Sequence, residues 1–245
     1  MTEDLSNGCT NNFPVSFHVF GIGESFKPII DKISALGYEG VSATTIKPKQ
    51  LPSPTEEDRM VIILTDEGND LVVDAAKSYY QAGVLTLVVS HQQIGSQCKF
   101  CDAQLEADTE AIYKPVKAIL DMIFNNGLIP LDFNDIRSCL NDSGFFKVVE
   151  STGKGSDERV ADAISKIENI ISHKEKSAIE DFIISISFNH DIQPPISMRE
   201  MKTLSDFLSS LPEGIDAILG VFHDDKMPLD EVRLTAVISG KELKP

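Results

Sequence analysis

Short, continuous apolar runs recur along the first half of the chain and alternate with segments of helical spacing. The apolar runs fall within 15–23, 40–46, 59–70 and 84–90, and the helical segments within 26–37 and 70–83. A strand that is apolar at nearly every position is buried on both faces, as in parallel sheets covered by helices on both sides. Parallel neighbours need crossover connections, and the helical segments supply them. The alternation therefore predicts a doubly wound α/β sheet.

The pattern changes after a long helical segment at 107–127, which contains Pro115. Strands are then expected at 145–151, 180–189, 214–224 and 231–240, and helices at 131–144, 156–174 and 198–211. The last two strands are close in sequence and are most simply a hairpin, so this half is predicted to be a four-stranded sheet carrying helices. The expected organisation is a disordered segment 1–12, a sheet domain 13–107, a central helix 108–127 and an α+β domain 128–241.

The charge of the chain excludes several partners. Its formal net charge is -16, from 38 acidic and 22 basic side chains. Both halves, 1–127 and 128–245, carry about equal negative charge, so the acidity is spread along the chain. Such a surface repels nucleic acid and anionic membranes. The apolar runs are too short to span a bilayer, and the polar start predicts no signal peptide. Four cysteines without an export signal indicate reduced thiols in a cytoplasm.

Three segments of the second half resemble the tubulin/FtsZ superfamily. GLIPLDFNDIR (127–137) is similar to the junction where the family's central helix ends in an acidic loop. STGKGSDERVADAI (151–164) and EVRLTAVISG (231–240) resemble a strand, turn and helix and the closing strand of the same domain. The resemblance covers about 108–241, and the first half matches in element order only. It implies a reduced, Rossmann-like parallel sheet joined by a long central helix to an α+β domain.

The resemblance also implies a nucleotide site, but the residues there depart from the family pattern. The family's phosphate loop is rich in glycine and threonine, whereas DEGND (66–70) has one glycine and three acids. The first turn keeps Gly21 and Gly23 but continues with Glu24. Carboxylates repel a triphosphate and lack the bare N–H cradle that binds one. We therefore expect no cofactor. The alternative is a GTP site at Gly21, Gly23, Gly68 and Asn69, with magnesium bridging the acids to phosphate.

Asp132 and Asp135 match the two acidic positions of the family's loop, with Pro130 where the family usually has asparagine. In the family this loop enters a neighbour's nucleotide pocket and positions the attacking water. The same residues fit a second interpretation, in which Asp132 is a helix N-cap and Asp135 an acid of the first turn. The leading hypothesis is an FtsZ-like protein that assembles head-to-tail with itself or caps filaments of an FtsZ-like GTPase. A divergent GTPase and a small-ligand or interaction module are the alternatives.

Three further groups are weaker candidates. His91, Cys98 and Cys101 offer part of a zinc site, which needs four ligands, and Cys139 is a distant fourth. The segment TGKGS (152–156) lacks the spacing of a phosphate-binding loop and is predicted to be a simple turn. The segment HDD (223–225) is expected to be a solvated loop, with a metal or acid–base role as the alternative.

Overall fold

A computed structural model describes residues 15–47, 50–66, 70–91, 100–108, 111–171 and 178–241, with backbone alone at 70, 71 and 73–75. Within these residues the strands are β1 (Ser16–Ile22), β2 (Val41–Ile46), β3 (Asp58–Thr65), β4 (Leu85–Ser90), β5 (Ala103–Glu106), β6 (Gly127–Ile129), β7 (Gly144–Lys154), β8 (Ile179–Phe188), β9 (Asp216–His223) and β10 (Glu231–Gly240). The helices are η1 (Glu24–Phe26), α1 (Lys27–Ser34), α2 (Asp70–Gln81), α3 (Tyr113–Phe124), α4 (Phe133–Leu140), α5 (Arg159–Ile170) and α7 (Met198–Ser209).

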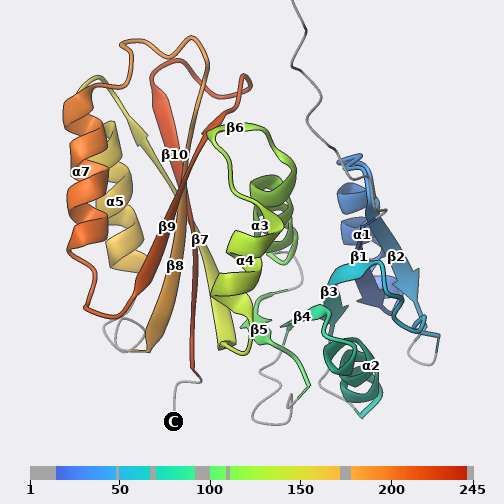
Figure 1. The fold of residues 1–245 in the computed structure, drawn as a ribbon. Coiled ribbons are helices and arrows are strands. Elements are labelled where there is room, and N and C mark those ends of the chain that lie inside the picture. The colour runs from blue at the N-terminus through green and yellow to red at the C-terminus, as the bar shows by residue number, and fades with distance from the viewer. Residues whose placement is uncertain are drawn as a thin grey trace, which may run out of the picture.

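These strands form one mixed sheet in the order β2-β1-β3-β4-β5-β7-β10-β8-β9-β6 (Figure 1). Strands β1 to β5 are parallel, as the apolar runs predict for the first four of them. Strand β5 also pairs with β7, through Ala103 with Gly144 and Gln104 with Phe145, so the two halves of the chain share the sheet. The predicted α/β class is confirmed. The division into domains at 107 and 128 stays a prediction.

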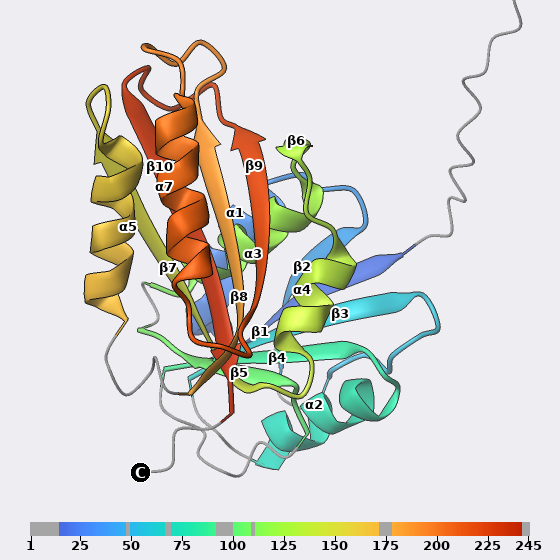
Figure 2. The same cartoon turned by 60° about the vertical axis from the view of Figure 1, so that its left-hand side comes forward.

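The helices lie in three groups around this twisted sheet (Figures 1 and 2). Helix α2 covers one face of β1, β3 and β4, and helices α5 and α7 cover one face of the β7–β10 half. Helices α1, α3 and α4 lie between the two halves and contribute to the largest core, together with side chains from both halves of the sheet. Each group places a stripe of apolar residues against the strands, as amphipathic helices do.

The predicted hairpin of the last two strands is wrong. Strand β8 lies between β9 and β10: it is antiparallel to β10 and parallel to β9. Strand β10 pairs with β7 on its other side, and its last seven residues are all buried. The physical reason is burial, because a strand apolar on both faces is stabilised most at the centre of a sheet. Helix α7 supplies the crossover from β8 to β9.

Helix α3 is shorter than the expected central helix. Its 12 residues, Tyr113–Phe124, place Pro115 in the first turn, where a missing N–H costs little. At the other end the chain leaves the helix at Asn125 and forms β6, which pairs with β9. The end of the central helix and the junction after it were expected at these residues. A Cβ on Gly127 would lie 2.5 Å from the carbonyl oxygen of Val221, so this close pairing requires glycine. The four-residue strand β5 lies where a loop was expected.

Candidate functional site

The carboxyl ends of the parallel strands form one edge of the first half of the sheet. The register aligns Gly21 of β1 with Leu64 of β3, and Thr65 of β3 with Ser90 of β4. Ser90 is in turn aligned with Glu106 of β5. The last residues of these four strands therefore lie side by side. Ligands of open α/β sheets bind at this edge, beyond the strand ends.

The first of these turns uses its glycines for packing. A Cβ on Gly21 would lie 2.6 Å from Cβ of Phe26, a fully buried residue in η1. Gly23 has a φ of 107°, which L side chains rarely adopt. Both glycines thus let η1 fold back onto the end of β1. Gly68 and Asn69, the other residues of the expected nucleotide site, lie outside the described residues.

A carboxylate joins the first turn to the third strand. The Ser25 hydroxyl donates a hydrogen bond of 2.6 Å to Oδ2 of Asp66, the residue directly after β3. Glu24 is exposed beside Ser25 and adds a second negative charge. Lys27 begins α1 and Lys47 directly follows β2, so exposed cations also lie along this edge. The sequence had not indicated the contact between Ser25 and Asp66, which are 41 residues apart.

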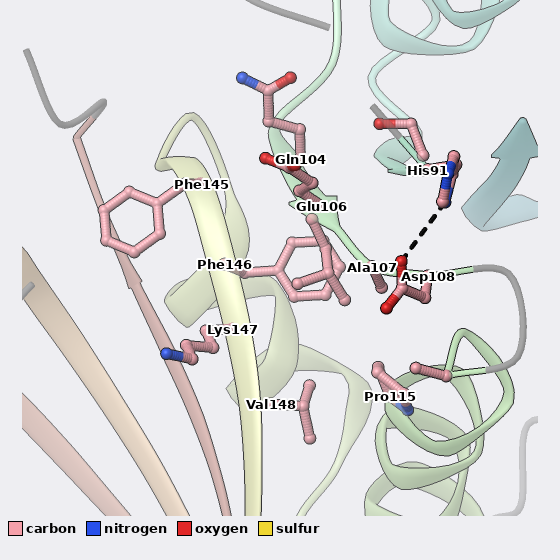
Figure 3. Close-up of a pocket in the computed structure, with 13 residues that line it drawn as sticks. His91, Gln104, Glu106, Ala107, Asp108, Pro115, Phe145, Phe146, Lys147 and Val148 are labelled. Atoms are coloured by element: carbon pink, nitrogen blue, oxygen red, sulfur yellow. Dashed lines mark ion pairs between the residues drawn. The ribbon is translucent and has the colours of Figure 1, made fainter. Parts of the chain in front are cut away.

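A cavity of about 600 Å³ lies further along the same edge, between β5, β7 and the start of α3 (Figure 3). Phe145, Phe146 and Val148 contribute apolar surface, and Lys147 also lines the cavity. His91 Nδ1 lies 3.6 Å from Oδ1 of Asp108 at its rim. Oε1 of Gln104 is buried and has no hydrogen-bond partner among the described residues. Aromatic walls with a few polar groups are typical of small-ligand sites. The adjacent phenylalanines of β7 were the available sequence signal.

The described residues do not bring a zinc site together. His91 faces Asp108, whereas Cys101 packs against the cluster under α2. Cys98 lies outside the described residues, and among those described no three metal-ligating side chains group together. Cys139 is buried in the core, where burial raises the pKa of its thiol to about 12. A thiol in that state is a poor metal ligand.

The two aspartates of the acidic turn form a capping box at the start of α4. Asp132 accepts hydrogen bonds from the backbone N–H groups of Asn134, at 2.6 Å, and Asp135, at 3.1 Å. Asp135 Oδ2 in return accepts from the N–H of Asp132 at 2.8 Å. The prediction of a cap is therefore confirmed. Asp132 is nevertheless exposed, and Asp135 partly so, which leaves oxygen lone pairs facing outward.

An apolar surface adjoins this acidic turn. Leu128 and Ile129 of β6 are 63% and 47% exposed, which is high for large aliphatic side chains. Strand β6 is the last strand of the sheet and pairs with β9 alone among the described residues. Leu131 is buried and anchors the turn, since its side chain fills the space that a Cβ on Gly220 would enter. The turn is thus a fixed surface of two carboxylates beside two aliphatic side chains.

The two remaining candidate segments are structural. The segment predicted as a turn at 152–156 is partly strand, and Lys154 pairs with Glu231 of β10 at 2.9 Å. Asp224 of the HDD segment accepts from Nη2 of Arg233 at 2.6 Å. Burial alone would raise the pKa of Asp224, but hydrogen bonds from Arg233 and Lys226 outweigh it and hold this pKa low. Neither segment presents a phosphate or metal site.

The fold described above, with an open edge of parallel strands, an acidic turn and a second, mixed half of the same sheet, is the fold of solved FtsZ and TubZ structures. Solved structures agree over nearly the whole chain. A W319Y mutant of FtsZ from M. jannaschii superposes with a TM-score of 0.72 and 16% identity, covering 94% of this chain and 93% of that one. A TubZ protofilament structure from Bacillus thuringiensis gives 0.63 and 6% identity, covering 93% and 86%.

Sequence comparison identifies the family within this fold. The FtsZ cell division protein of Porphyromonas gingivalis is 24% identical over 160 residues, 64% of this chain and 34% of that protein. FtsZ 1 of Rhizobium meliloti is 30% identical over 181 residues, 69% and 29% respectively. The chain is therefore a member of the tubulin/FtsZ superfamily and a distant homologue of FtsZ. The matched part spans about a third of these curated relatives. No protein-family model matches the chain.

One negative finding concerns membranes. Among the residues that the structure describes, no helix is both long and apolar enough to cross a bilayer.

Proposed function

We propose that this protein acts through contacts with an FtsZ-like partner and does not bind GTP in the manner of the family. The observation that supports this most directly is the Asp66 carboxylate, held 2.6 Å from the Ser25 hydroxyl. It joins the turn after β1 to the end of β3, two of the places where the resemblance implies phosphate contacts. The Asp66 carboxylate therefore competes with a phosphate for the hydrogen bond that the Ser25 hydroxyl donates.

The electrostatic cost of a triphosphate at this edge is substantial. Two unit charges 4 Å apart repel by roughly 1 kcal/mol in water and by roughly 4 kcal/mol at the effective dielectric of a protein surface. Asp66 and Glu24 would each repel several phosphate charges. Lys27 and Lys47 offset part of this, but both are exposed and their attraction is screened. The balance favours a site without nucleotide.

The contact surface in this proposal is the acidic turn with its apolar neighbours. Asp132 and Asp135 provide the charge, and Leu128 and Ile129 provide apolar area that a partner would bury. The turn is preformed by its capping box, so a partner would not have to order it. This supports a role in which the chain presents carboxylates to the nucleotide pocket of a neighbour, as the resemblance implies.

The partner in this proposal is an FtsZ-like GTPase rather than a second copy of the chain. Head-to-tail packing of two copies would place Asp132 and Asp135 of one near Glu24 and Asp66 of the next. Like charges at such an interface cost several kcal/mol. A heterologous contact that does not repeat ends a filament instead of extending it. We therefore propose a filament-capping role and expect it to operate in the cytoplasm.

The first test is calorimetric titration with GTP and magnesium, beside light scattering of the protein alone. We expect no heat of binding at micromolar nucleotide and no scattering that depends on GTP. Micromolar binding, or a polymer that forms only with GTP, contradicts the proposal and favours the divergent GTPase.

The second test measures the partner contact with FtsZ of Porphyromonas gingivalis as the probe. Adding the chain to FtsZ polymers should shorten them in sedimentation. The double variant Asp132→Asn and Asp135→Asn should lose this effect, because it keeps capping side chains and removes both charges. Glu168→Gln, an exposed acid on α5, is the matched control and should act like the unmodified chain. Equal activity of all three proteins would exclude the acidic turn as the contact.

A small-ligand role is a second candidate, and the cavity beside Phe146 favours it. The buried, unpartnered Oε1 of Gln104 would accept a hydrogen bond from a ligand donor. Ligand-detected NMR with a library of small aromatic compounds checks this. If a compound that binds the unmodified chain no longer binds the Gln104→Leu variant, the cavity is supported as the site. An unchanged binding signal with the variant would exclude it.

A further inference from the structure

A serine, a histidine and an aspartate lie in line on the face of the sheet that α2 covers. Nδ1 of His18 is 2.6 Å from Oγ of Ser42, and Nε2 of His18 is 2.8 Å from Oδ1 of Asp58. They come from three neighbouring strands, β1, β2 and β3. This is the set of groups that activates a serine hydroxyl as a nucleophile, recognised by geometry and not by chain order. The arrangement is independent of the acidic turn and of the edge discussed above.

The parallel register creates this contact. His18 and Ser42 are direct partners in the β1–β2 ladder, so their side chains leave the same face side by side. Asp58 begins β3 and is aligned with Ser16, one residue before a shift in the β1–β3 register. The aspartate therefore reaches the ring from the opposite side to the serine.

The hydrogen bonds fix which ring nitrogen carries the proton. Asp58 is 6% exposed, and its other carboxylate oxygen accepts from the N–H of Thr55 at 2.9 Å. Burial raises the pKa of Asp58, but the hydrogen bonds from Thr55 and His18 outweigh it and hold this pKa below its ordinary value. An ionised carboxylate only accepts, so Nε2 of His18 is the donor. In a neutral ring Nδ1 is then the acceptor, and the Ser42 hydroxyl donates to it.

Aromatic packing holds the imidazole in this position. The His18 ring stacks on Phe20, with centroids 5.4 Å apart and planes 8° apart, and lies 6.5 Å from the Tyr79 ring. The His18 side chain remains 21% exposed, and Ser42 is exposed. The base is therefore ordered by packing, while the hydroxyl is accessible to a reagent from solvent. Preorganisation of this kind is what general-base catalysis requires.

We propose that Ser42 is a nucleophile for acyl transfer, with His18 as its general base and Asp58 as the residue that orients His18, acting on small activated esters. Oγ of Ser42 forms a bond to the acyl carbon while its proton moves to Nδ1 of His18. The ester C–O bond breaks, and the departing alkoxide takes that proton from His18. Water then attacks the acyl-serine by the same route, which releases the acid and restores the hydroxyl.

The edge position of β2 supplies a donor for the charge that develops on the carbonyl oxygen. Gly40 and Ile46 accept from N–H groups of Phe17 and Gly23, so the even-numbered residues of β2 face β1. Backbone groups alternate in direction along a strand, and β2 has no other neighbour among the described strands. The N–H of Ala43, directly after the nucleophile, therefore points toward the open edge. A single backbone donor next to the serine is the minimal oxyanion site.

The test is covalent labelling with an alkyl fluorophosphonate, which bonds to an activated serine with loss of fluoride. Peptide mapping of the labelled, folded chain should place the adduct on Ser42. His18→Ala should slow labelling by about 10²- to 10⁴-fold, the usual contribution of a general base. Thr44→Ala, an exposed hydroxyl on the same face of β2, should leave the rate unchanged. Hydrolysis of p-nitrophenyl acetate should show the same order among these variants.

Two comparisons keep the result interpretable when a variant folds poorly. In the unmodified chain Ser25 is an internal reference, because its hydroxyl contacts a carboxylate with no imidazole between them. Ser42 should be labelled and Ser25 should not, and labelling of Ser42 should vanish in urea. An adduct distributed over several serines, no adduct on Ser42, or an equal rate in folded His18→Ala would overturn the proposal.

Discussion

Removing the carboxylate of Glu200 should destabilise the fold more than any exposed acid does. Arg159 and Glu200 form an ion pair in which the side chains are 0% and 1% exposed. Nε of Arg159 donates to Oε1 of Glu200 at 2.8 Å, and Nη2 donates to Oε2 at 3.3 Å. Glu200 also accepts from the N–H of Ser197 at 2.9 Å, as the second partner of the capping box that starts α7. One side chain therefore joins α5 to α7.

The magnitude follows from what Glu200→Ala leaves behind. Breaking a buried pair by removing one partner costs about 3–5 kcal/mol, since the remaining charge stays in the interior. Loss of the cap adds about 1 kcal/mol. Arg159 has little means of compensating, because its Nη1 is already buried without a hydrogen-bond partner among the described residues. A loss of about 4–6 kcal/mol is a large fraction of the roughly 5–15 kcal/mol that holds a domain folded.

Urea denaturation followed by circular dichroism measures this loss, and two variants separate its causes. Glu200→Gln keeps the cap and removes the charge, so it should lose less than Glu200→Ala. Replacing both partners, Arg159→Met with Glu200→Met, should recover much of the stability because no charge stays buried. The exposed control Glu168→Ala should change stability by less than about 0.5 kcal/mol. A loss below about 1 kcal/mol for Glu200→Ala would refute this account of the pair.

Three further outcomes follow from described contacts. Burial raises the pKa of Glu200, but the hydrogen bond from Arg159 outweighs it and the pKa is lowered. The stabilisation by the Glu200 carboxylate is therefore complete above the ordinary glutamate pKa and is lost as the pH falls through the lowered pKa. The stability of the Glu200→Gln variant should accordingly change less with pH over this acidic range in an acid denaturation experiment. Asp132→Ala should lose about 1 kcal/mol in urea and Asp132→Asn much less, because asparagine also caps helices; equal losses would contradict the capping role. Gly153→Ala should lose more than about 2 kcal/mol in urea, since its Cβ would lie 1.7 Å from the Arg159 carbonyl oxygen, and near-native stability would contradict this packing.

The sequence predicts local elements well because burial patterns are local. Continuous apolar runs located β3 and β4, and the acids of the α4 turn located a helix start that proved to be a capping box. Pairing partners are not local, which is why β9 and β10 were wrongly joined as a hairpin. One signal in the sequence was the apolar run within β10, LTAVI, because a strand that is apolar on both faces suits the centre of a sheet better than its edge.

The side-chain contacts of the candidate sites were beyond sequence reasoning for the same reason. Ser25 meets Asp66 across 41 residues, and His18 meets Ser42 and Asp58 across 24 and 40. Nothing in the spacing of these residues predicts a contact. Each depends on the strand register, and a shift by one residue would turn the side chain to the opposite face.

The preformed state of the acidic turn has a consequence for how an FtsZ-like chain without nucleotide would work. A switch that depends on GTP needs a segment whose order changes when the terminal phosphate is lost. Here Asp132 and Asp135 are held by each other's backbone N–H groups, and Leu131 fixes the turn to the sheet. No described hydrogen bond of the turn involves the edge around Asp66. A ligand at that edge would therefore have little means of altering the turn, because coupling requires different contacts in two states. The proposed contact would then be constitutive, and its occupancy would be set by the concentration of the two proteins rather than by hydrolysis.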